Sequence, residues 1–346
     1  MKSVSHILAI RLSAMGDVAM TVSVIEELRK SYPELRITVL TRGAFRVFFR
    51  DIERIEFLPL ELGGRHKGFF GLLRLAADAK KAGVDAVADL HDVLRSKTLR
   101  LALRIAGCRT GKIDKGRKEK RKLVKAGYKN SRQLTPTVER YRKVFSDMGL
   151  DIPSPKPFVH VPRPVPQAIT DIAGHKDGTW VGIAPFAGHE GKAYPIEQAE
   201  KLASILARNC SRVFLFGGGD RERAQTEKIA EGHENIVSVI GWIKLGEELD
   251  LISNLDTIVT MDSSALHMAS LVGTRAVSLW GATHPYAGFY GLGQNPSDAL
   301  QTDMDCRPCS IYGNRACRFG NYPCMHGIRP ETVAAKVLNV SEEVLL

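Results

Sequence analysis

The sequence contains no apolar run of the roughly 18 residues that a membrane-spanning helix needs. A short apolar stretch near the N-terminus, residues 7–10, is interrupted by Arg11 and followed by Asp17. This pattern is typical of a first buried strand rather than of a signal peptide. Low-complexity tracts and short-period repeats are also missing. The cytoplasm is therefore the expected compartment.

Two common nucleotide-binding signatures are missing as well. Gly16 follows the first expected strand, but no G-x-G-x-x-G sequence surrounds it, so a dinucleotide cofactor is not indicated. The loop of residues 185–195 contains Lys192 and two glycines without the spacing of a P-loop, so nucleotide hydrolysis is not indicated either. A lysine in such a loop can still bind phosphate as a point charge.

Positive charge is in excess. The chain has 49 Lys and Arg against 38 Asp and Glu, a formal net charge of +11. Residues 109–132, here called the basic arm, contain eleven of these cations and two acids, so the rest of the chain is nearly neutral. The arm indicates an anionic partner (a phosphorylated glycolipid, a membrane surface or nucleic acid), or else a solvated, mobile loop. Its single aromatic residue, Tyr128, gives little support for base stacking.

Strand and helix patterns alternate along the 346 residues, which are enough for two domains. The expected strands are residues 6–12, 36–41, 55–58, 84–90, 180–184, 211–216, 236–239, 257–261 and 275–280. The expected helices are residues 18–31, 69–82, 95–105, 137–148, 196–208, 220–232, 245–254 and 265–271, with a further helical piece beginning at 47–50. Such alternation predicts parallel sheets covered by helices on both faces.

Six prolines in residues 151–166 exclude a helix interior there and indicate a linker. We therefore predict an α/β protein with a first domain at 1–150, a Pro-rich linker at 151–166 and a second domain at 167–346. Both domains are expected to be Rossmann-like and to face each other across a cleft, with the last helix packing back on the first domain. Clefts between domains are favoured ligand sites.

The most informative stretch is residues 259–281. A strand runs directly into Asp262, Ser263 and Ser264, and a helix follows with His267 one turn in. This turn lies at the carboxyl edge of a parallel sheet, where ligands bind. A helix N-terminus also offers N–H groups that suit a phosphate. The alternative is a capped helix in an ordinary βαβ unit.

Two other carboxylates can likewise be interpreted either as functional groups or as helix caps. Asp17 lies near the start of the first helix, where it either accepts a proton from a sugar hydroxyl or caps the helix. Glu222 follows the Phe216-to-Asp220 glycine loop, where it either contacts a ribose hydroxyl or caps the next helix.

Four of the six cysteines cluster near the C-terminus, at Cys306, Cys309, Cys317 and Cys324. The first pair has the spacing of a structural zinc site, but the second pair is too widely separated for the usual second knuckle. Reduced structural thiols are the favoured interpretation in the cytosol, and zinc is the alternative.

Several segments together resemble glycosyltransferase family 9, the lipopolysaccharide heptosyltransferases and their relatives. They are residues 7–34, 184–203, 261–285 and the cysteine segment. The resemblance covers most of the chain and implies a GT-B architecture with an acceptor-binding first domain and a nucleotide-sugar-binding second domain. It further implies inverting transfer of heptose from ADP-heptose to the lipopolysaccharide inner core or a related glycolipid. Neither a cofactor nor a catalytic metal is expected.

The resemblance also assigns residues. Asp17 matches the family's proposed base, Lys192 matches a lysine on the donor phosphates, and Asp262, Ser263, Ser264 and His267 match the donor-binding turn. Here Ser-Ser replaces the usual Thr-Gly. The base pocket corresponds to Gly241 and Trp242, and Glu222 is a further donor contact. In the basic arm, the expected contacts with an anionic acceptor at the cytoplasmic face of the inner membrane are Arg117, Lys118, Lys120 and Arg121.

Other functions stay open at this point. Another GT-B sugar transferase or a nucleotide-sugar epimerase has the same architecture. A protein without enzymatic activity would use the basic arm to bind an anionic surface or nucleic acid, although no nucleic-acid partner is expected. A zinc-dependent regulator would use the cysteine segment.

Overall fold

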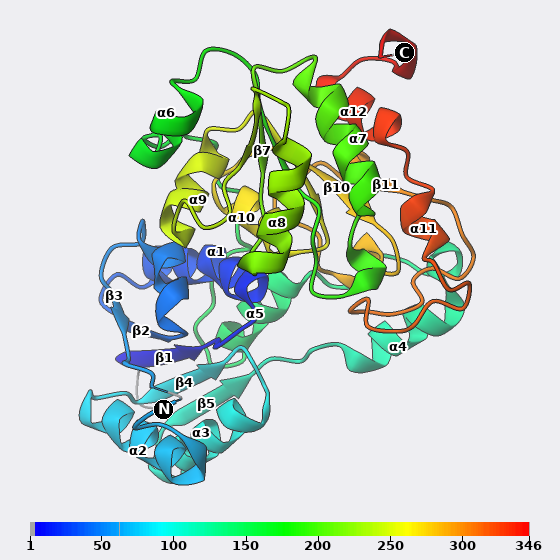
Figure 1. The fold of residues 1–346 in the computed structure, drawn as a ribbon. Coiled ribbons are helices and arrows are strands. Elements are labelled where there is room, and N and C mark those ends of the chain that lie inside the picture. Colours follow the sequence, from blue (N-terminus) through cyan, green and yellow to red (C-terminus); the bar gives the residue numbers. More distant parts are fainter. Residues whose placement is uncertain (1–3, 62, 346) are drawn as a thin grey trace. The chain divides into compact units, whose positions relative to one another are not determined.

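The computed structural model describes residues 4–61 and 63–345, which form two compact units, each built around a parallel sheet (Figure 1). The first unit contains the chain up to residue 115 together with residues 136–156. The second contains residues 116–135 and the chain from 157 onward. The predicted α/β architecture of two parallel, Rossmann-like sheets is confirmed.

The sheet of the first unit has the strand order β3-β2-β1-β4-β5. Its strands are β1 (His6–Ile10), β2 (Arg36–Leu40), β3 (Ile55–Phe57), β4 (Ala86–Asp89) and β5 (Arg109–Lys112). Its helices are α1 (Met15–Ser31), the 3-10 helix η1 (Gly43–Phe49), α2 (Gly68–Lys81), α3 (Leu94–Ile105) and α5 (Thr137–Ser146).

Helices cover both faces of this sheet, so β1 and β4 are buried along their whole length, as expected for parallel strands. One face is covered by α1 and α5, and the other by α2 and α3 (Figure 1). On the second face, Leu72 and Leu75 of α2 pack with Leu99 of α3 and with Leu8 and Ile10 of β1.

The second unit has a sheet in the order β11-β10-β9-β6-β7-β8. Its strands are β6 (Trp180–Ala184), β7 (Arg212–Leu215), β8 (Ile236–Ser238), β9 (Thr257–Met261), β10 (Ala276–Trp280) and β11 (Ala299–Gln301). Its helices include α4 (Arg117–Ala126), α6 (Gln167–Ala173), the 3-10 helix η3 (Glu190–Lys192), α7 (Ile196–Ala207), α8 (Gly219–Ala230), α9 (Leu245–Ser253), α10 (Ser264–Leu271), α11 (Pro323–His326) and α12 (Pro330–Leu338).

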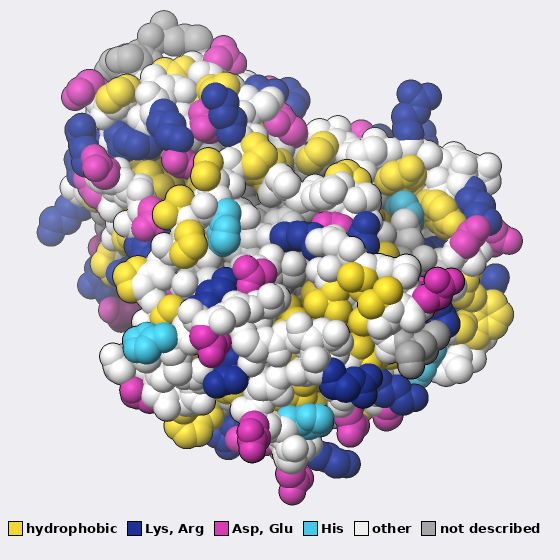
Figure 2. Space-filling model, turned by 90° about the horizontal axis from the view of Figure 1, so that it is seen from above, with side chains coloured by type: hydrophobic (Ala, Val, Ile, Leu, Met, Phe, Trp, Pro, Cys, Tyr) yellow, Lys and Arg dark blue, Asp and Glu magenta, His cyan; other side chains and the backbone are white. Residues whose placement is uncertain are grey.

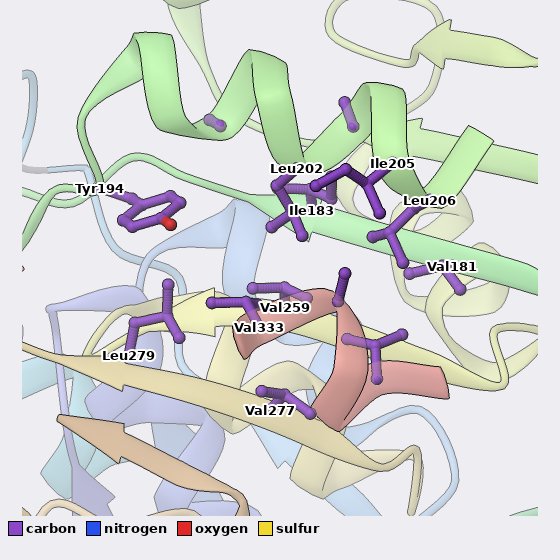
Figure 3. Close-up of a cluster of buried hydrophobic side chains, with 14 of the residues drawn as sticks. Val181, Ile183, Tyr194, Leu202, Ile205, Leu206, Val259, Val277, Leu279 and Val333 are labelled. Atoms are coloured by element: carbon purple, nitrogen blue, oxygen red, sulfur yellow. The ribbon is translucent and has the colours of Figure 1, made fainter. Parts of the chain in front are cut away.

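The core of the second unit lies between its central strands and two helices. Figure 3 shows Leu202 and Leu206 of α7 and Val333 of α12 gathered over Ile183 of β6 and Val259 of β9. These five side chains are fully buried. Each apolar side chain of this size contributes about 1.5–3 kcal/mol when removed from water, so this layer fixes the strands that carry the second site.

Both sheets have a point at which the strand order reverses direction. In the first sheet the reversal lies between β1 and β4, and in the second between β6 and β9. Parallel sheets bind ligands outside the carboxyl ends of the two strands that flank this reversal. The loops after β1, β4, β6 and β9 are therefore where functional side chains are expected.

The units of the structure differ from the predicted boundaries. The basic arm is divided between the two units: residues 109–112 form the edge strand β5 of the first unit, and residues 116–135, with α4, pack in the second unit. The predicted linker packs too, because residues from 157 belong to the second unit. The last helix, α12, packs on α7, since Val333 and Ala334 join the apolar core of the second unit.

Charge on the molecular surface is mixed on the side shown in Figure 2. Acidic and basic side chains are interspersed there, and apolar side chains lie in small groups between them. Within residues 4–61 and 63–345, no helix has the length and apolar character to cross a bilayer.

Candidate active site

Asp17 lies in the first turn of α1, just after β1, rather than in the loop before the helix. Its Oδ2 atom lies 2.6 Å from Nη2 of Arg11, and the backbone N–H of Ala14 donates to the same oxygen at 3.4 Å. The Asp17 side chain is 27% exposed, whereas that of Arg11 is 9% exposed. The ion pair therefore presents its carboxylate, and not its cation, to solvent.

Arg11 was not among the predicted site residues, yet it orients Asp17. Its Nη1 donates to the backbone oxygen of Leu90 at 2.8 Å, which ties the loop after β1 to the end of β4. The hydroxyl of Tyr141 on α5 lies 3.5 Å from the other oxygen of Asp17, and the Arg11 guanidinium lies 5.8 Å from the Tyr141 ring centre. Asp17 is thus held from three elements, which favours a fixed position for a general base.

His91, just after β4, lies beside this pair. Burial, and after it the positive charge of Arg11, lower the pKa of His91 to about 4. The imidazole is therefore neutral near pH 7 and does not compete with Arg11 for the Asp17 carboxylate. The sequence placed His91 at a strand end but gave no reason to join it to Asp17.

The corresponding position of the second unit holds Lys192 and Asp262. Lys192 lies in η3 after β6, Asp262 follows β9, and these two strands are neighbours in the sheet. The Nζ atom of Lys192 donates to Oδ2 of Asp262 at 3.2 Å, with 16% and 7% of the respective side chains exposed. Two of the predicted donor-binding residues therefore contact each other directly.

Close packing positions the lysine. A Cβ atom on Gly313, whose φ is +74°, would lie 2.4 Å from Cγ of Lys192. A Cβ atom on Gly191 would lie 2.8 Å from Cβ of Ala282. Both glycines let neighbouring loops approach the lysine stem closely, so substitution at either position would displace it.

The helix α10 begins beside this pair, and Ser263 is its N-cap residue as predicted. Its hydroxyl does not cap the helix but lies 3.2 Å from the hydroxyl of Thr260. The first N–H groups of a helix have no partner within it and carry a partial positive charge. With Lys192 they form a cationic seat next to Ser264, suited to a phosphate.

A comparison with known proteins decides the family. The family model described as glycosyltransferase family 9 (heptosyltransferase) matches residues 72–318. The chain belongs to glycosyltransferase family 9. Among its relatives, a lipooligosaccharide heptosyltransferase 2 of Haemophilus influenzae is 26% identical over 298 residues, which is 81% of this chain and 84% of the relative.

Solved structures of family 9 share the fold. A family 9 glycosyl transferase from Veillonella parvula superimposes with a TM-score of 0.73 at 18% identity, covering 100% of this chain and 98% of that one. The E. coli ADP-heptose lps heptosyltransferase II superimposes with a TM-score of 0.69 at 18% identity, covering 96% and 98%. Similarity therefore extends over the full length of both units.

The other predicted donor residues of this family 9 chain lie along the same carboxyl edge. Glu222 follows β7 and accepts a hydrogen bond from the backbone N–H of Gly218 at 2.7 Å, so it caps α8. Gly241, with φ +84°, and Trp242, which is 61% exposed, follow β8. His267 is buried in α10 one turn beyond Ser263. Lys192 and Asp262 contact each other beside the start of α10.

The predicted acceptor residues lie on α4 in the second unit. Arg117, Lys118 and Arg121 are exposed. Lys120 is 6% exposed, and its Nζ lies 3.9 Å from the ring centre of Phe289. A cation–π contact with a buried stem serves packing, so Lys120 differs from the three surface cations.

The cysteine segment has a structural function that the sequence did not reveal. Arg307, between the first two cysteines, is 1% exposed and donates to the backbone oxygens of Trp280, Gly281 and Thr283 at 2.5–3.1 Å. It thereby holds the loop after β10. All six cysteines are free thiols. The clustered four line one cavity of about 290 Å³, but among the described residues no three ligand-type side chains are arranged to hold a metal ion.

Proposed function

We propose that this chain transfers heptose from ADP-heptose to the lipopolysaccharide inner core or a related glycolipid, with inversion at the anomeric carbon. The second unit would bind the donor, and Asp17 of the first unit would act on the acceptor. The observation that carries the donor assignment is the cationic seat formed by Lys192 and the start of α10 in a family 9 chain.

The donor diphosphate would displace Asp262 as the partner of Lys192. A diphosphate offers more negative charge and more acceptor oxygens than one carboxylate, and charge-assisted hydrogen bonds are the stronger ones. The N–H groups at the start of α10 would stabilise the departing diphosphate by donation. In this proposal, Lys192 and the N–H groups of α10 stabilise the negative charge of the leaving diphosphate, so transfer needs no divalent metal.

The chemical step would be a single displacement. Asp17 takes the proton of an acceptor hydroxyl, whose oxygen forms a bond to the anomeric carbon of heptose. The bond from that carbon to the diphosphate oxygen breaks at the same time, and its electron pair leaves with ADP. Arg11 orients the Asp17 carboxylate through their ion pair.

The acceptor would be anionic, and the surface cations Arg117, Lys118 and Arg121 of α4 would contact its phosphates. Because such an acceptor is anchored in lipid, we place the protein in the cytoplasm and on the cytoplasmic face of the inner membrane.

A donor panel tests this function. Purified protein is heated with ADP-heptose, ADP-glucose, UDP-sugars or GDP-sugars, since a ligand at 100 times its Kd stabilises the folded state by about 2.7 kcal/mol. ADP-heptose should give the largest rise in unfolding temperature, and an inner-core acceptor should then gain one heptose with inverted configuration. Stabilisation by a UDP-sugar alone would assign another transferase, and an epimerised sugar formed without acceptor would assign an epimerase.

A further inference from the structure

The helices α2 and α3 expose large apolar side chains on the side away from their sheet. On α2, the exposed fractions are 61% for Phe69 and 74% for Phe70. On α3 they are 81% for Leu94, 57% for Leu101 and 79% for Ile105. Together with Leu73, these are six of the fourteen exposed large apolar residues in the described chain, concentrated on two short helices. We call the six residues the α2–α3 apolar face.

Helix periodicity shows that this face is not part of the core. The buried residues of α2 include Leu72, Leu75 and Ala79, and those of α3 include Leu99 and Leu103. The core stripe therefore lies on one side of each helix, and a second apolar stripe lies on the other. A helix of a soluble domain normally places polar residues there. The two helices pack side by side (Figure 1), so their outer stripes form one surface.

The charge around this surface has one sign. The two helices contain seven Lys and Arg residues and a single acid, Asp78. The Asp78 carboxylate is already paired: it accepts hydrogen bonds from Arg65 at 2.7 Å, and its Oδ2 lies 3.2 Å from Nε2 of His66. Among the residues that the structure describes, no hydrogen bond or ion pair is made by the side chains of Arg74, Lys81, Arg95 and Arg104.

We propose that the α2–α3 apolar face docks on an anionic lipid bilayer. Phe69, Phe70, Leu94, Leu101 and Ile105 would enter the boundary between headgroups and acyl chains, while the unpaired cations contact lipid phosphates. Aromatic and aliphatic side chains flanked by Lys and Arg are the composition of interfacial helices, and anionic leaflets attract such cations. The proposal rests on the proposed function, in which the acceptor is a glycolipid.

The basic arm, which the sequence suggested for this contact, lacks the apolar component. On α4 the exposed positions include Arg117, Lys118, Arg121 and Lys122, whereas Leu123 is buried in the second unit. The arm thus has charge without a hydrophobic anchor. Binding to a membrane through charge alone is weakened by salt. We therefore assign the membrane contact to the α2–α3 apolar face, and contact with the acceptor headgroup to the basic arm.

Vesicle sedimentation of the full-length protein tests this assignment. Phosphatidylcholine vesicles with phosphatidylglycerol should bind the protein, and pure phosphatidylcholine vesicles should bind it weakly. Phe69→Ser with Phe70→Ser should weaken binding to the anionic vesicles by at least about tenfold, because both rings are removed from the bilayer. The matched control is Val159→Ser with Val161→Ser, two exposed apolar residues of the second unit, and it should leave binding unchanged.

Two charge-reversal variants compare the contributions of the two basic regions to vesicle binding. Arg74→Glu with Arg104→Glu should weaken vesicle binding by about tenfold or more, since each cation near an anionic surface contributes substantially. Lys118→Glu with Lys122→Glu on α4 should weaken it less. A larger effect on α4, normal vesicle binding by the Phe69 and Phe70 variant, or no binding of the unaltered protein to anionic vesicles would overturn the proposal. So would light scattering that shows the face holding two copies of the chain together.

Stabilisation by ADP-heptose, measured on the same variants, separates this proposal from the proposed function. It should be unchanged in the α2–α3 variants, because the donor seat is in the second unit. If the variants weaken vesicle binding as expected but ADP-heptose does not stabilise the protein, the membrane proposal is supported and the donor assignment is wrong. If ADP-heptose stabilises the protein but the variants do not weaken vesicle binding, the membrane proposal is wrong and the donor assignment is supported.

Discussion

Each unit has a cation–carboxylate pair near the reversal point of its sheet, Arg11–Asp17 in the first unit and Lys192–Asp262 in the second. The carboxylate is the more exposed partner in the first pair, and the cation is the more exposed partner in the second. In the first unit, Asp17 is 27% exposed and its partner Arg11 is 9% exposed. In the second unit, Lys192 is 16% exposed and its partner Asp262 is 7% exposed. The same construction therefore offers a negative group in one unit and a positive group in the other. In each pair, the less exposed partner holds the more exposed group in position.

The largest effect is expected from the exposed group of the first pair. Asp17→Asn keeps the shape but removes the base, so transfer should fall by about 10²–10⁴-fold. Stabilisation by ADP-heptose should stay normal, because the second unit is unchanged. Asp147→Asn, an exposed acid of the same unit, is the control for turnover. Near-normal turnover in the Asp17 variant would assign the base elsewhere.

A smaller loss is expected from the exposed group of the second pair. Lys192→Met should lower kcat/KM by about 10²–10³-fold and reduce stabilisation by ADP-heptose, because a preorganised cation on the leaving group is lost. Removal of the lysine also leaves Asp262 buried and unpaired, which costs stability. The double variant with Asp262→Asn should recover thermal stability without recovering activity, and Lys201→Met on α7 should change neither. If ADP-heptose stabilised the Lys192 variant as much as the unaltered protein, Lys192 would not be part of the donor site.

The buried partner of the first pair should have a weaker effect than the base itself. Arg11→Gln removes the charge beside Asp17 and the tie to Leu90. We expect kcat to fall by about 10- to 100-fold with little change in donor KM, since an orienting group acts through another residue. Steady-state kinetics measure both parameters, and an unchanged kcat would mean that Arg11 only supports the fold.

The smallest effect concerns acid stability. Burial lowers the pKa of His91 to about 4 in the folded protein, compared with about 6.5 in an unfolded chain. The stability from keeping this imidazole neutral is complete above about pH 6.5 and is lost as the pH falls toward 4. His91→Asn should therefore reduce the drop in unfolding temperature between about pH 7.5 and 5 by a few degrees.

His284 provides the comparison in the second unit, because burial and then Arg307 lower its pKa to about 4 as well. His284→Asn should behave similarly. A response of one histidine and not the other would show that the two units differ in acid sensitivity.

The alternating fold could be predicted because the central strands are apolar runs buried on both faces. β5 was missed, since residues 109–112 carry no apolar run and join the sheet through backbone pairing with β4. The helix α4 was missed because its buried side consists of Leu123 and the stem of Lys120, too little to show a helical period among so many cations. Local pattern finds elements with large apolar faces and overlooks those fixed by a few contacts.

The candidate residues could be selected from the sequence because each lies after a strand and at or near the start of the next helix. Asp262 directly follows β9, Asp17 lies in the first turn of α1 and Lys192 lies in η3; Lys192 and Asp262 form the pair at the start of α10. Tyr141 and Arg307 could not be predicted, because their partners are remote in sequence or are backbone oxygens. Such contacts leave no spacing to recognise.

The return of residues 116–135 to the second unit has a consequence for how this molecule can be divided. The chain passes between the units three times, near residues 115, 135 and 156. Cleavage of the chain at one position cannot give two fragments that each contain a complete unit. A fragment ending at residue 150 would contain α4 but would leave Leu123 without the residues that bury it. The remaining fragment would lack α4, whose Lys120 packs on Phe289. An exchange of one half between related enzymes would therefore need three junctions rather than a single fusion point.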